Sequence, residues 1–347
     1  MTPSTTRPTR RGVLTGAVLA AALLVAGCGG APADPAPAAG DGPRTLTLYS
    51  GREEDLVGPL LVQFQQQSGI TVDTRYGSTT ELAAQLAEEG AATPAQVFLS
   101  QDAGALGALA GAGAFAPLPE EVRGAVTAPY TATDGTWTGL TGRVRVAAYN
   151  TRVPEAEVPA DVTELTDPRW RGRVGIAPTN ASFQAFVTAL RVQEGDDAAR
   201  AFLEGLRANE VQVFPRNTAI LEAVDSGVVD VGLINHYYVA AAETPPANTA
   251  LKFGAPGTAS ALVNVTGAGV LAGAAESTEA RELLRFLVSP QAQEYFARET
   301  GEYPLVAGVA GPAGMPALAD LRAPRLDLAD LEDLDGTTQL MTQVGLL

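Results

Sequence analysis

Two adjacent tyrosines, Tyr237 and Tyr238, are the side chains of this sequence best suited to bind a hard, highly charged cation. A free phenol has a pKa of about 10, and it becomes an anionic oxygen ligand when a metal displaces its proton. The pair follows a buried-looking strand, 229–234, and begins a helical stretch, so a change of backbone direction can point both rings into one cleft. The alternative is one core tyrosine and one surface tyrosine, and the surrounding residues have to decide between the two.

A second group of polar residues is suited to an anion. Asn180 and Ser182 open a predicted helix over 183–192, where free N–H groups and the helix dipole favour negative charge. Arg143 can add a guanidinium that binds two oxygens at once. Taken singly, Asn180, Ser182 and Asn217 are also ordinary helix caps, and Arg143 is an ordinary surface charge.

Residue counts exclude several other kinds of site. The chain has one histidine, His236, and one cysteine, Cys28, which excludes zinc fingers, iron–sulfur clusters, multi-histidine centres and disulfide scaffolds. A serine hydrolase would need His236 as its base, yet the chain has no Gly-x-Ser-x-Gly elbow, and bulky tyrosines follow the histidine. We expect no enzyme activity, and we expect His236 to support the tyrosines rather than to bind metal.

The composition indicates a folded, acidic protein. Its 347 residues are 46% hydrophobic, which is enough for a large core. The length suits two domains better than one, because single cores stop growing at roughly 250 to 300 residues. With 23 Lys and Arg against 39 Asp and Glu, the formal charge of −16 repels phosphate backbones, so no nucleic-acid partner is expected.

The N-terminus has the features of a secretory leader. Residues 1–27 carry three arginines and no acid, with an apolar run over 13–26. Val25-Ala26-Gly27-Cys28 resembles a bacterial lipobox, which makes Cys28 the predicted lipidated first residue of the mature protein. Residues 28–43 would then form this lipidated cysteine and a Pro- and Gly-rich tether. The arginine pair at 10–11 leaves open whether export is general or twin-arginine dependent.

The remainder of the chain alternates between strands and helices, which indicates an α/β fold with ligand sites at the carboxyl ends of strands. The first predicted set is strand 45–50, helix 54–68, strand 70–75, helix 80–89, strand 96–100 and helix 103–110. The second set has strands at 144–149, 173–177, 211–214 and 229–234 with helices between them, then a strand at 261–271 and helices at 278–288 and 290–300. These two sets predict two α/β lobes.

Four segments together carry a family resemblance. They are Ile234–Tyr238 (INHYY), Thr141–Asn150 (TGRVRVAAYN), Asp167–Asn180 (DPRWRGRVGIAPTN) and Glu302–Leu305 (EYPL). In their order and spacing, residues 44–347 resemble the periplasmic ferric-iron-binding proteins, the transferrin-like substrate-binding components of iron ABC importers.

The resemblance implies a two-lobed periplasmic-binding-protein fold, similar to type II, with hinge crossovers and a ligand cleft between the lobes. On this basis we expect an N-terminal lobe of residues 44–142 plus 264–300. The C-terminal lobe would consist of residues 143–263 plus 301–347.

The resemblance also implies an iron(III) site built on the phenolates of Tyr237 and Tyr238. The family's other protein ligands are a histidine and a glutamate, and the aligned positions here hold Glu53 and Gln101. Glu53 can still supply an anionic oxygen, whereas Gln101 is a poor ligand that we expect to orient a water or close the cleft. Arg52 could hold an anion beside the metal. Glu53 and Gln101 could equally be solvated residues of strand–helix turns.

Family members that bind phosphate together with iron imply a set of anion-binding positions. In this sequence those positions hold Arg143, Asn180, Ala181, Ser182, Asn217 and Asn235. Other members place a further tyrosine where Asn180-Ala181-Ser182 stands. Its absence favours iron(III) bound with a synergistic anion, either phosphate or carbonate.

The function implied by the resemblance is capture of iron(III) and delivery to an ABC permease in the inner membrane. The protein would be an exported, monomeric lipoprotein, periplasmic or at the cell surface, held to the membrane by the lipid on Cys28. The alternative is the same binding fold for another small solute, such as an oxyanion, thiamine or a polyamine. The sequence has no obvious aromatic box for an organic cation.

Overall fold

The computed structural model describes residues 44–126, 128–242 and 244–347. The predicted signal peptide, the lipidation site at Cys28 and the tether that ends at residue 43 lie outside the described residues. Within the described ranges, none of the helices combines the length and the apolar character that crossing a membrane requires.

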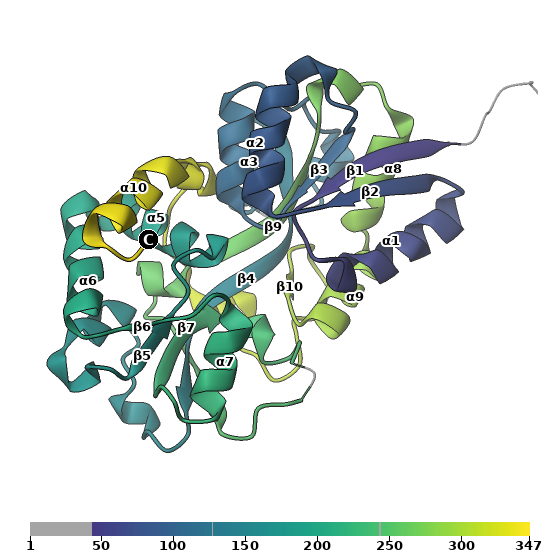
Figure 1. The fold of residues 1–347 in the computed structure, drawn as a ribbon. Coiled ribbons are helices and arrows are strands. Elements are labelled where there is room, and N and C mark those ends of the chain that lie inside the picture. The colour runs from purple at the N-terminus through teal and green to yellow at the C-terminus, as the bar shows by residue number, and fades with distance from the viewer. Residues whose placement is uncertain (1–43, 127, 243) are drawn as a thin grey trace, which may run out of the picture. The chain divides into compact units, whose positions relative to one another are not determined.

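The first part of the described chain builds parallel strands covered by helices (Figure 1). Its elements are β1 (Thr45–Ser50), α1 (Glu54–Ser68), β2 (Thr71–Tyr76), α2 (Thr79–Glu89), β3 (Val97–Ser100), α3 (Ala103–Gly111) and α4 (Glu120–Arg123). The strands and helices predicted over 45–110 are confirmed to within one residue at each end. They are predictable because each apolar pattern stops at a turn residue, such as Gly69, which ends α1 with φ +70°.

Two long antiparallel strands connect the first part of the sheet to the second. β4 (Trp137–Asn150) pairs with β9 (Val263–Val270) over 137–144, and then with β7 (Val231–Asn235) and β8 (Thr249–Phe253) over 145–150. All of β4 is buried. The sequence predicts strand only over 144–149, because the Thr- and Gly-rich stretch before it lacks a strand pattern. Its pairing with the distant β9 decides its conformation instead.

The second part of the sheet has its own covering helices. Its elements are β5 (Val174–Ile176), α5 (Ala181–Glu194), α6 (Asp196–Ala208), β6 (Gln212–Val213) and α7 (Asn217–Asp225), followed by β7 and β8. The strand order across the sheet is β2-β1-β3-β9-β4-β7-β5-β6, and both β8 and β10 (Tyr303–Pro304) pair with β4. β8 is absent from the predicted strands because its residues are half-buried without alternation.

The C-terminal helices are α8 (Thr278–Leu287), α9 (Pro290–Tyr295) and α10 (Leu334–Val344). α10, for which the sequence makes no prediction, packs against α5 and α6. The predicted helix 290–300 is not one regular helix, since α9 continues as a π-helical turn over Phe296–Thr300. That turn ends at Gly301, which has a φ of +68° and directs the chain back toward β4.

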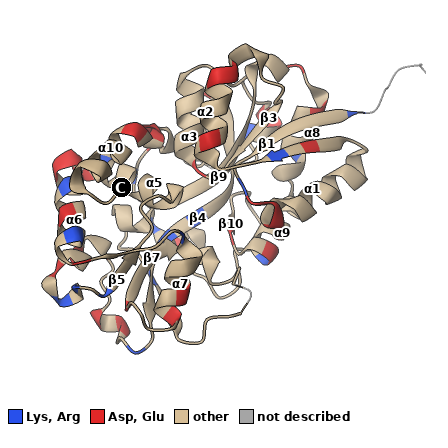
Figure 2. Cartoon of the chain, in the orientation of Figure 1, with Lys and Arg blue, Asp and Glu red and all other residues tan. Residues whose placement is uncertain are grey.

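β4 is the strand shared by both parts of the sheet, in keeping with a hinge between two lobes. The predicted lobe boundaries, 44–142 plus 264–300 and 143–263 plus 301–347, stay a prediction. Acidic residues are spread over many elements instead of gathering at one place (Figure 2). The net charge therefore does not by itself mark a binding site.

Candidate metal centre

Tyr237 and Tyr238 lie in a tight turn at the end of a fully buried strand. β7 ends at Asn235, and a 3₁₀ turn over His236–Tyr238 follows at once. Neighbouring side chains of a strand point to opposite faces, but in this turn the two rings stack, with centroids 4.4 Å apart and planes 25° apart. Tyr237 is buried, and Tyr238 is partly buried. The predicted change of backbone direction is confirmed, and it brings the two phenols together.

The surroundings of Tyr238 favour the neutral phenol. Burial is the main cause that raises its pKa well above the ordinary value, and the neighbouring Tyr237 side chain raises it further. A hydrogen bond with Asn217 and the positive charge of Arg52 act in the opposite direction. A cation must displace a firmly held proton to bind here, so binding would release protons.

His236 points into the core and supports the turn. Its Nδ1 accepts a hydrogen bond from the Val144 N–H (3.1 Å), and its ring packs on that of Tyr303 with centroids 4.8 Å apart. Burial lowers the pKa of His236 to about 4, so the imidazole is neutral at physiological pH. This arrangement agrees with the supporting role expected from the sequence.

Amide and hydroxyl groups beside Tyr238 form one hydrogen-bonded cluster. Asn217 Nδ2 donates to Ser182 Oγ (3.1 Å) and to Asn180 Oδ1 (3.2 Å), and Asn180 Oδ1 also accepts from the Ser182 N–H (3.0 Å). Asn180 caps α5, which begins at Ala181 and not at residue 183 as predicted. The N-terminus of α5, Asn217 and Tyr238 therefore meet at one place, where the first N–H groups of the helix favour an anion.

Arg145, which the sequence analysis did not name, also belongs to this amide cluster. Its Nη1 donates to Ser182 Oγ (3.2 Å) and its Nη2 to the Leu233 carbonyl (2.7 Å). Burial lowers its pKa to about 9, while interaction with Tyr238 and Tyr237 raises it. Asn235 lies opposite Arg145 in the register of β4 and β7. The sequence feature that could have identified Arg145 is the Arg-x-Arg spacing on one strand, which places Arg143 and Arg145 on the same face.

Arg143 lies two residues earlier on β4 and is 1% exposed. Its guanidinium nitrogens have no hydrogen-bond partner among the described residues. Burial raises the pKa of the Asp102 carboxyl, and the charge of Arg143 offsets part of that rise. The same charge contributes to lowering the pKa of His236. Buried guanidinium groups normally have partners, so Arg143 has donors to offer to an anion or to water.

Arg52 connects the first part of the chain to the tyrosines. Its guanidinium lies over the Tyr237 ring, 5.7 Å from the ring centroid, and the two side chains interact electrostatically. Its Nη2 also donates to Glu302 Oε1 at 2.8 Å, and both side chains of this ion pair are buried. Sequence reasoning singled out Arg52 and the EYPL segment but missed their pairing, because 250 residues separate the partners.

The positions of Glu53 and Gln101 do not decide whether these residues bind metal. Glu53 is exposed and stands just before α1, and Gln101 is half-buried with its N–H donating to Thr79 Oγ1 (2.9 Å). Neither side chain forms a hydrogen bond or ion pair with the described part of the chain. Over the same residues, His, Cys, Asp and Glu side chains form no group of three that could hold a metal. The ligand roles of Glu53 and Gln101 stay predictions.

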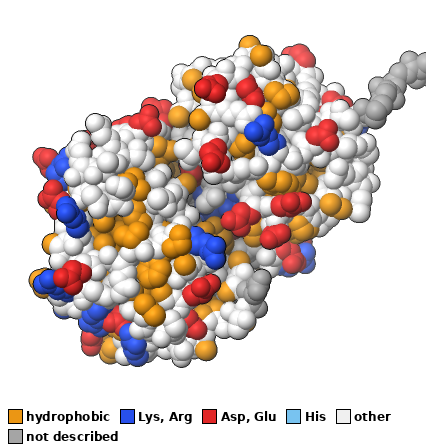
Figure 3. Space-filling model, viewed as in Figure 1, with side chains coloured by type: hydrophobic (Ala, Val, Ile, Leu, Met, Phe, Trp, Pro, Cys, Tyr) orange, Lys and Arg blue, Asp and Glu red, His pale blue; other side chains and the backbone are white. Residues whose placement is uncertain are grey.

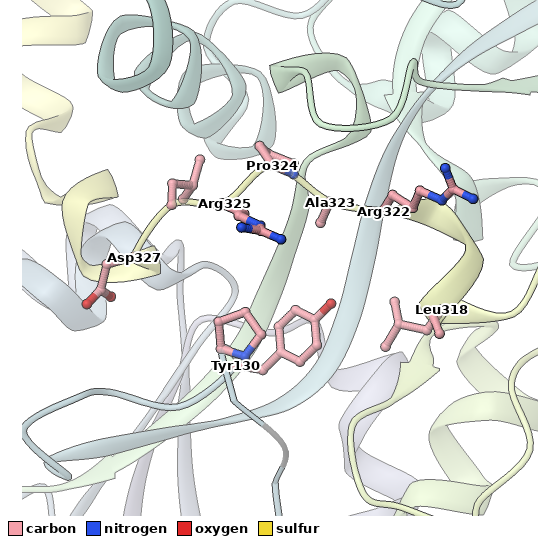
Figure 4. A pocket seen from close by; sticks show the side chains of 10 residues that line it. Tyr130, Leu318, Arg322, Ala323, Pro324, Arg325 and Asp327 are labelled. Carbon is pink, nitrogen blue, oxygen red and sulfur yellow. The ribbon is translucent and has the colours of Figure 1, made fainter.

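A cavity of about 530 Å³ is lined by residues outside these groups (Figure 4). Tyr130 faces the segment 318–327 across it, and the guanidinium groups of Arg322 and Arg325 belong to exposed residues. None of the predicted site residues lines this cavity. It therefore adds nothing to the candidate metal centre.

Residues 92–332 match the family model of the bacterial extracellular solute-binding proteins. The chain belongs to this family. The Fe(3+)-binding periplasmic protein of Serratia marcescens is 33% identical over 311 residues, covering 87% of this chain and 90% of the relative. The major ferric iron-binding protein of Neisseria meningitidis serogroup B is 32% identical, covering 95% and 98%. The solved structure of iron-bound HitA from Pseudomonas aeruginosa has a TM-score of 0.83 and 34% identity, covering 87% of this chain and all of that one.

These likenesses confirm three predictions from the sequence. The resemblance to periplasmic ferric-iron-binding proteins is confirmed, and so is the two-lobed α/β fold. The protein is a solute-binding protein rather than an enzyme. The Serratia relative is named a periplasmic protein, which agrees with export, while the lipid on Cys28 stays a prediction.

Proposed function

We propose that this protein captures iron(III) outside the cytoplasm, with Tyr237 and Tyr238 as ligands and a synergistic anion beside them. The stacked pair of phenols carries the proposal, because Arg52 lies over the Tyr237 ring on one side and Asn217 interacts with Tyr238 on the other. The names of the Serratia and Neisseria relatives support the choice of metal.

The chemistry of the side chains fits a trivalent, hard cation. Iron(III) favours anionic oxygen, and two phenolates supply it once their protons leave. Glu53, at the start of α1, would add a carboxylate oxygen. Gln101 would orient a water or close the cleft rather than bind iron itself.

An anion would complete the iron site and balance its charges. The proposed anion-binding residues are Arg143, Asn180, Ala181, Ser182, Asn217 and Asn235, and to these we add Arg145. Arg143 and Arg145 are both buried, and neither forms an ion pair with a carboxylate among the described residues. A phosphate or carbonate would supply the missing negative charge and accept their N–H groups.

Capture would serve import through a membrane permease. The exported protein would be tethered as a monomer through the lipid on Cys28, close its two lobes on iron and anion, and dock on an ABC permease in the inner membrane. The match to the extracellular solute-binding family and the periplasmic Serratia relative support this setting.

The test is an absorption titration of the purified apo protein with ferric citrate, with and without added phosphate or carbonate. We expect a visible phenolate-to-iron charge-transfer band that Tyr237→Phe and Tyr238→Phe each weaken strongly. Tyr76→Phe, which changes a half-buried tyrosine of β2, serves as the control and should leave the band intact. A wild-type protein without the band would contradict the proposal.

One observation favours a second candidate, an oxyanion as the transported solute itself. The buried Arg143 has no hydrogen-bond partner among the described residues, and Arg145 lies by the N-terminus of α5. Calorimetry with phosphate or carbonate alone separates the two candidates. Tight anion binding without iron would favour the oxyanion, whereas anion binding that requires iron favours the metal.

A further inference from the structure

The segment 300–303 packs directly against the tyrosine turn. Tyr303 lies under the His236 ring, and the Gly301 position faces Tyr237 and Ala240, where an added Cβ would stand 2.8 Å from the Ala240 Cβ. Between them, Glu302 is completely buried. A buried carboxylate this close to a candidate metal centre needs an explanation, because it is costly unless its oxygens are satisfied.

Two donors hold Glu302. Its Oε1 accepts from Arg52 Nη2 (2.8 Å), and its Oε2 accepts from Thr141 Oγ1 (3.0 Å). Thr300 Oγ1 lies 3.3 Å from Oε2, while its hydroxyl also donates to the Phe296 carbonyl at 2.8 Å. Thr141 belongs to β4, and Thr300 ends the π-helical turn. With both oxygens occupied in this way, the carboxylate has a fixed position and Arg52 has a fixed partner.

Arg52 is the link between Glu302 and the phenols. It is 2% exposed, and the Ser50 hydroxyl bonds both to its N–H (3.2 Å) and to its carbonyl (3.0 Å). Its guanidinium bonds Glu302 and at the same time lies over the ring of Tyr237, 5.7 Å from the ring centroid. A chain of contacts therefore runs from the segment after α9, through the loop after β1, to the tyrosine turn after β7.

The charges of Arg52 and Glu302 would act on a metal bound at Tyr237, so these contacts matter for binding as well as for packing. A bare guanidinium beside Tyr237 would repel a trivalent cation, and the repulsion would be strong because the site is buried and poorly screened. The carboxylate of Glu302 offsets that charge at 2.8 Å while leaving Arg52 able to donate to the phenol oxygen.

We propose that Glu302 is a positioning residue for iron capture: it holds the Arg52 guanidinium against Tyr237 and neutralises its charge toward the metal. This inference rests on the proposed function, since it assumes iron(III) on Tyr237. It deepens that function by assigning a role to a residue that does not itself reach the metal.

The experiment compares four variants of the full chain: Glu302→Gln, Arg52→Met, the double variant with both changes, and Glu299→Gln. Glu299 is an exposed carboxylate three residues away and serves as the matched control. Each variant is assayed for iron affinity by competition with citrate, for the position of the charge-transfer band, and for the thermal midpoint of the apo protein.

We expect Glu302→Gln to weaken iron binding by about tenfold or more, the usual effect of removing a group that orients a metal ligand. The band should also shift, because Arg52 no longer holds the Tyr237 oxygen. In the Arg52→Met background the same change should cost clearly less affinity than in the wild type, because Glu302 then has no guanidinium to position. Glu299→Gln should match the wild type.

Equal losses of affinity in both backgrounds, or a Glu302→Gln protein with wild-type affinity and band position, would overturn the inference. If Glu302→Gln does not fold, the double variant keeps the test open, because it buries no unpaired charge. Its affinity must then lie below that of Arg52→Met by less than about tenfold, the loss expected where Glu302 still positions a ligand. Failure of the proposed function is a separate result, since the wild-type protein would then lack the band altogether.

Discussion

At the scale of single residues, the phenol of Tyr238 links metal capture to acidity. Burial raises its pKa above the ordinary value, so the apo site holds a proton that iron(III) must displace. Iron affinity should therefore rise with pH, by about tenfold per pH unit for each proton released. Competition titrations between about pH 6 and 8, corrected for protonation of the chelator, measure this slope. A pH-independent affinity would show that no phenol loses its proton on binding.

The free energy of unfolding of the apo protein should decrease as the pH rises, whereas the iron affinity increases. The folded-state pKa of Tyr238 lies above its unfolded value of about 10, so the buried phenol stabilises the fold below that pH. This contribution is lost as the pH rises through the folded-state pKa. The free energy of unfolding should accordingly decrease less in Tyr238→Phe than in the wild type when the pH is raised from about 8 to 10.5. Urea denaturation at the two pH values measures this difference.

Arg145 should affect anion binding rather than the stability of the fold. Burial lowers its pKa to about 9, so the buried charge is unfavourable unless an anion balances it. Arg145→Met should leave the apo free energy of unfolding unchanged or higher. It should also weaken the enhancement of iron binding by phosphate or carbonate by about tenfold, the loss of one charge-assisted hydrogen bond.

Arg298→Met, an exposed arginine near the end of α9, is the matched control for Arg145. It should retain the full anion effect in the same titrations. If Arg145→Met also retains it, the anion is held by Arg143 or by the amide cluster instead. The sequence analysis named only Arg143. A strand places Arg143 and Arg145 on one face, and packing against Ser182 is what distinguishes Arg145.

At the scale of elements, the tyrosine turn depends on the backbone of Gly301. Gly301 and Gly69 have nearly the same left-handed φ, +68° and +70°, but only Gly301 has a neighbour that an added Cβ would strike. Gly69→Ala should lower the free energy of unfolding by about 1 to 2 kcal/mol through backbone strain alone. Gly301→Ala should cost more and should also weaken iron binding, because Ala240 and Tyr237 must shift.

Urea unfolding and the citrate competition assay, run on both glycine variants, separate these effects. Equal losses of stability with unchanged iron affinity would mean that the segment 300–303 does not support the tyrosines. The Glu302 inference would then lose one of its structural premises.

The elements differ in how far the sequence could predict them. The strands and helices over 45–110 follow from local patterns, since apolar spacing and turn residues mark their ends. The first half of β4 could not be predicted in this way, because its strand conformation comes from pairing with β9 and β10. The Tyr237–Tyr238 pair followed from the sequence, whereas the Arg52–Glu302 pair joins residues with no local signal in common.

At the scale of the whole molecule, the sheet places the candidate centre where its two parts meet. β4 pairs with β9 on the side of β1–β3 and with β7 on the side of the tyrosines. Arg52 comes from the first part and Tyr237 from the second. A change in the angle between the parts would therefore alter their contact, which is how closure can be coupled to iron.

The net charge of the molecule should control how fast an iron chelate arrives. The formal charge is −16, and acidic side chains are spread across the visible face (Figure 3). Ferric citrate is itself anionic, so the long-range field of the protein repels it. The Debye length falls from about 30 Å at 10 mM salt to about 10 Å at 100 mM, which removes repulsion at a distance but leaves contacts in the buried site largely unscreened.

The association rate for ferric citrate should therefore increase over that range of salt, as measured by stopped-flow growth of the charge-transfer band. A variant with the exposed, unpaired Glu88, Glu164 and Glu204 changed to glutamine should bind faster than the wild type at low salt and show a smaller salt effect. A rate that falls with salt would mean that the buried arginines Arg52, Arg143 and Arg145 attract the chelate more strongly than the acidic surface repels it.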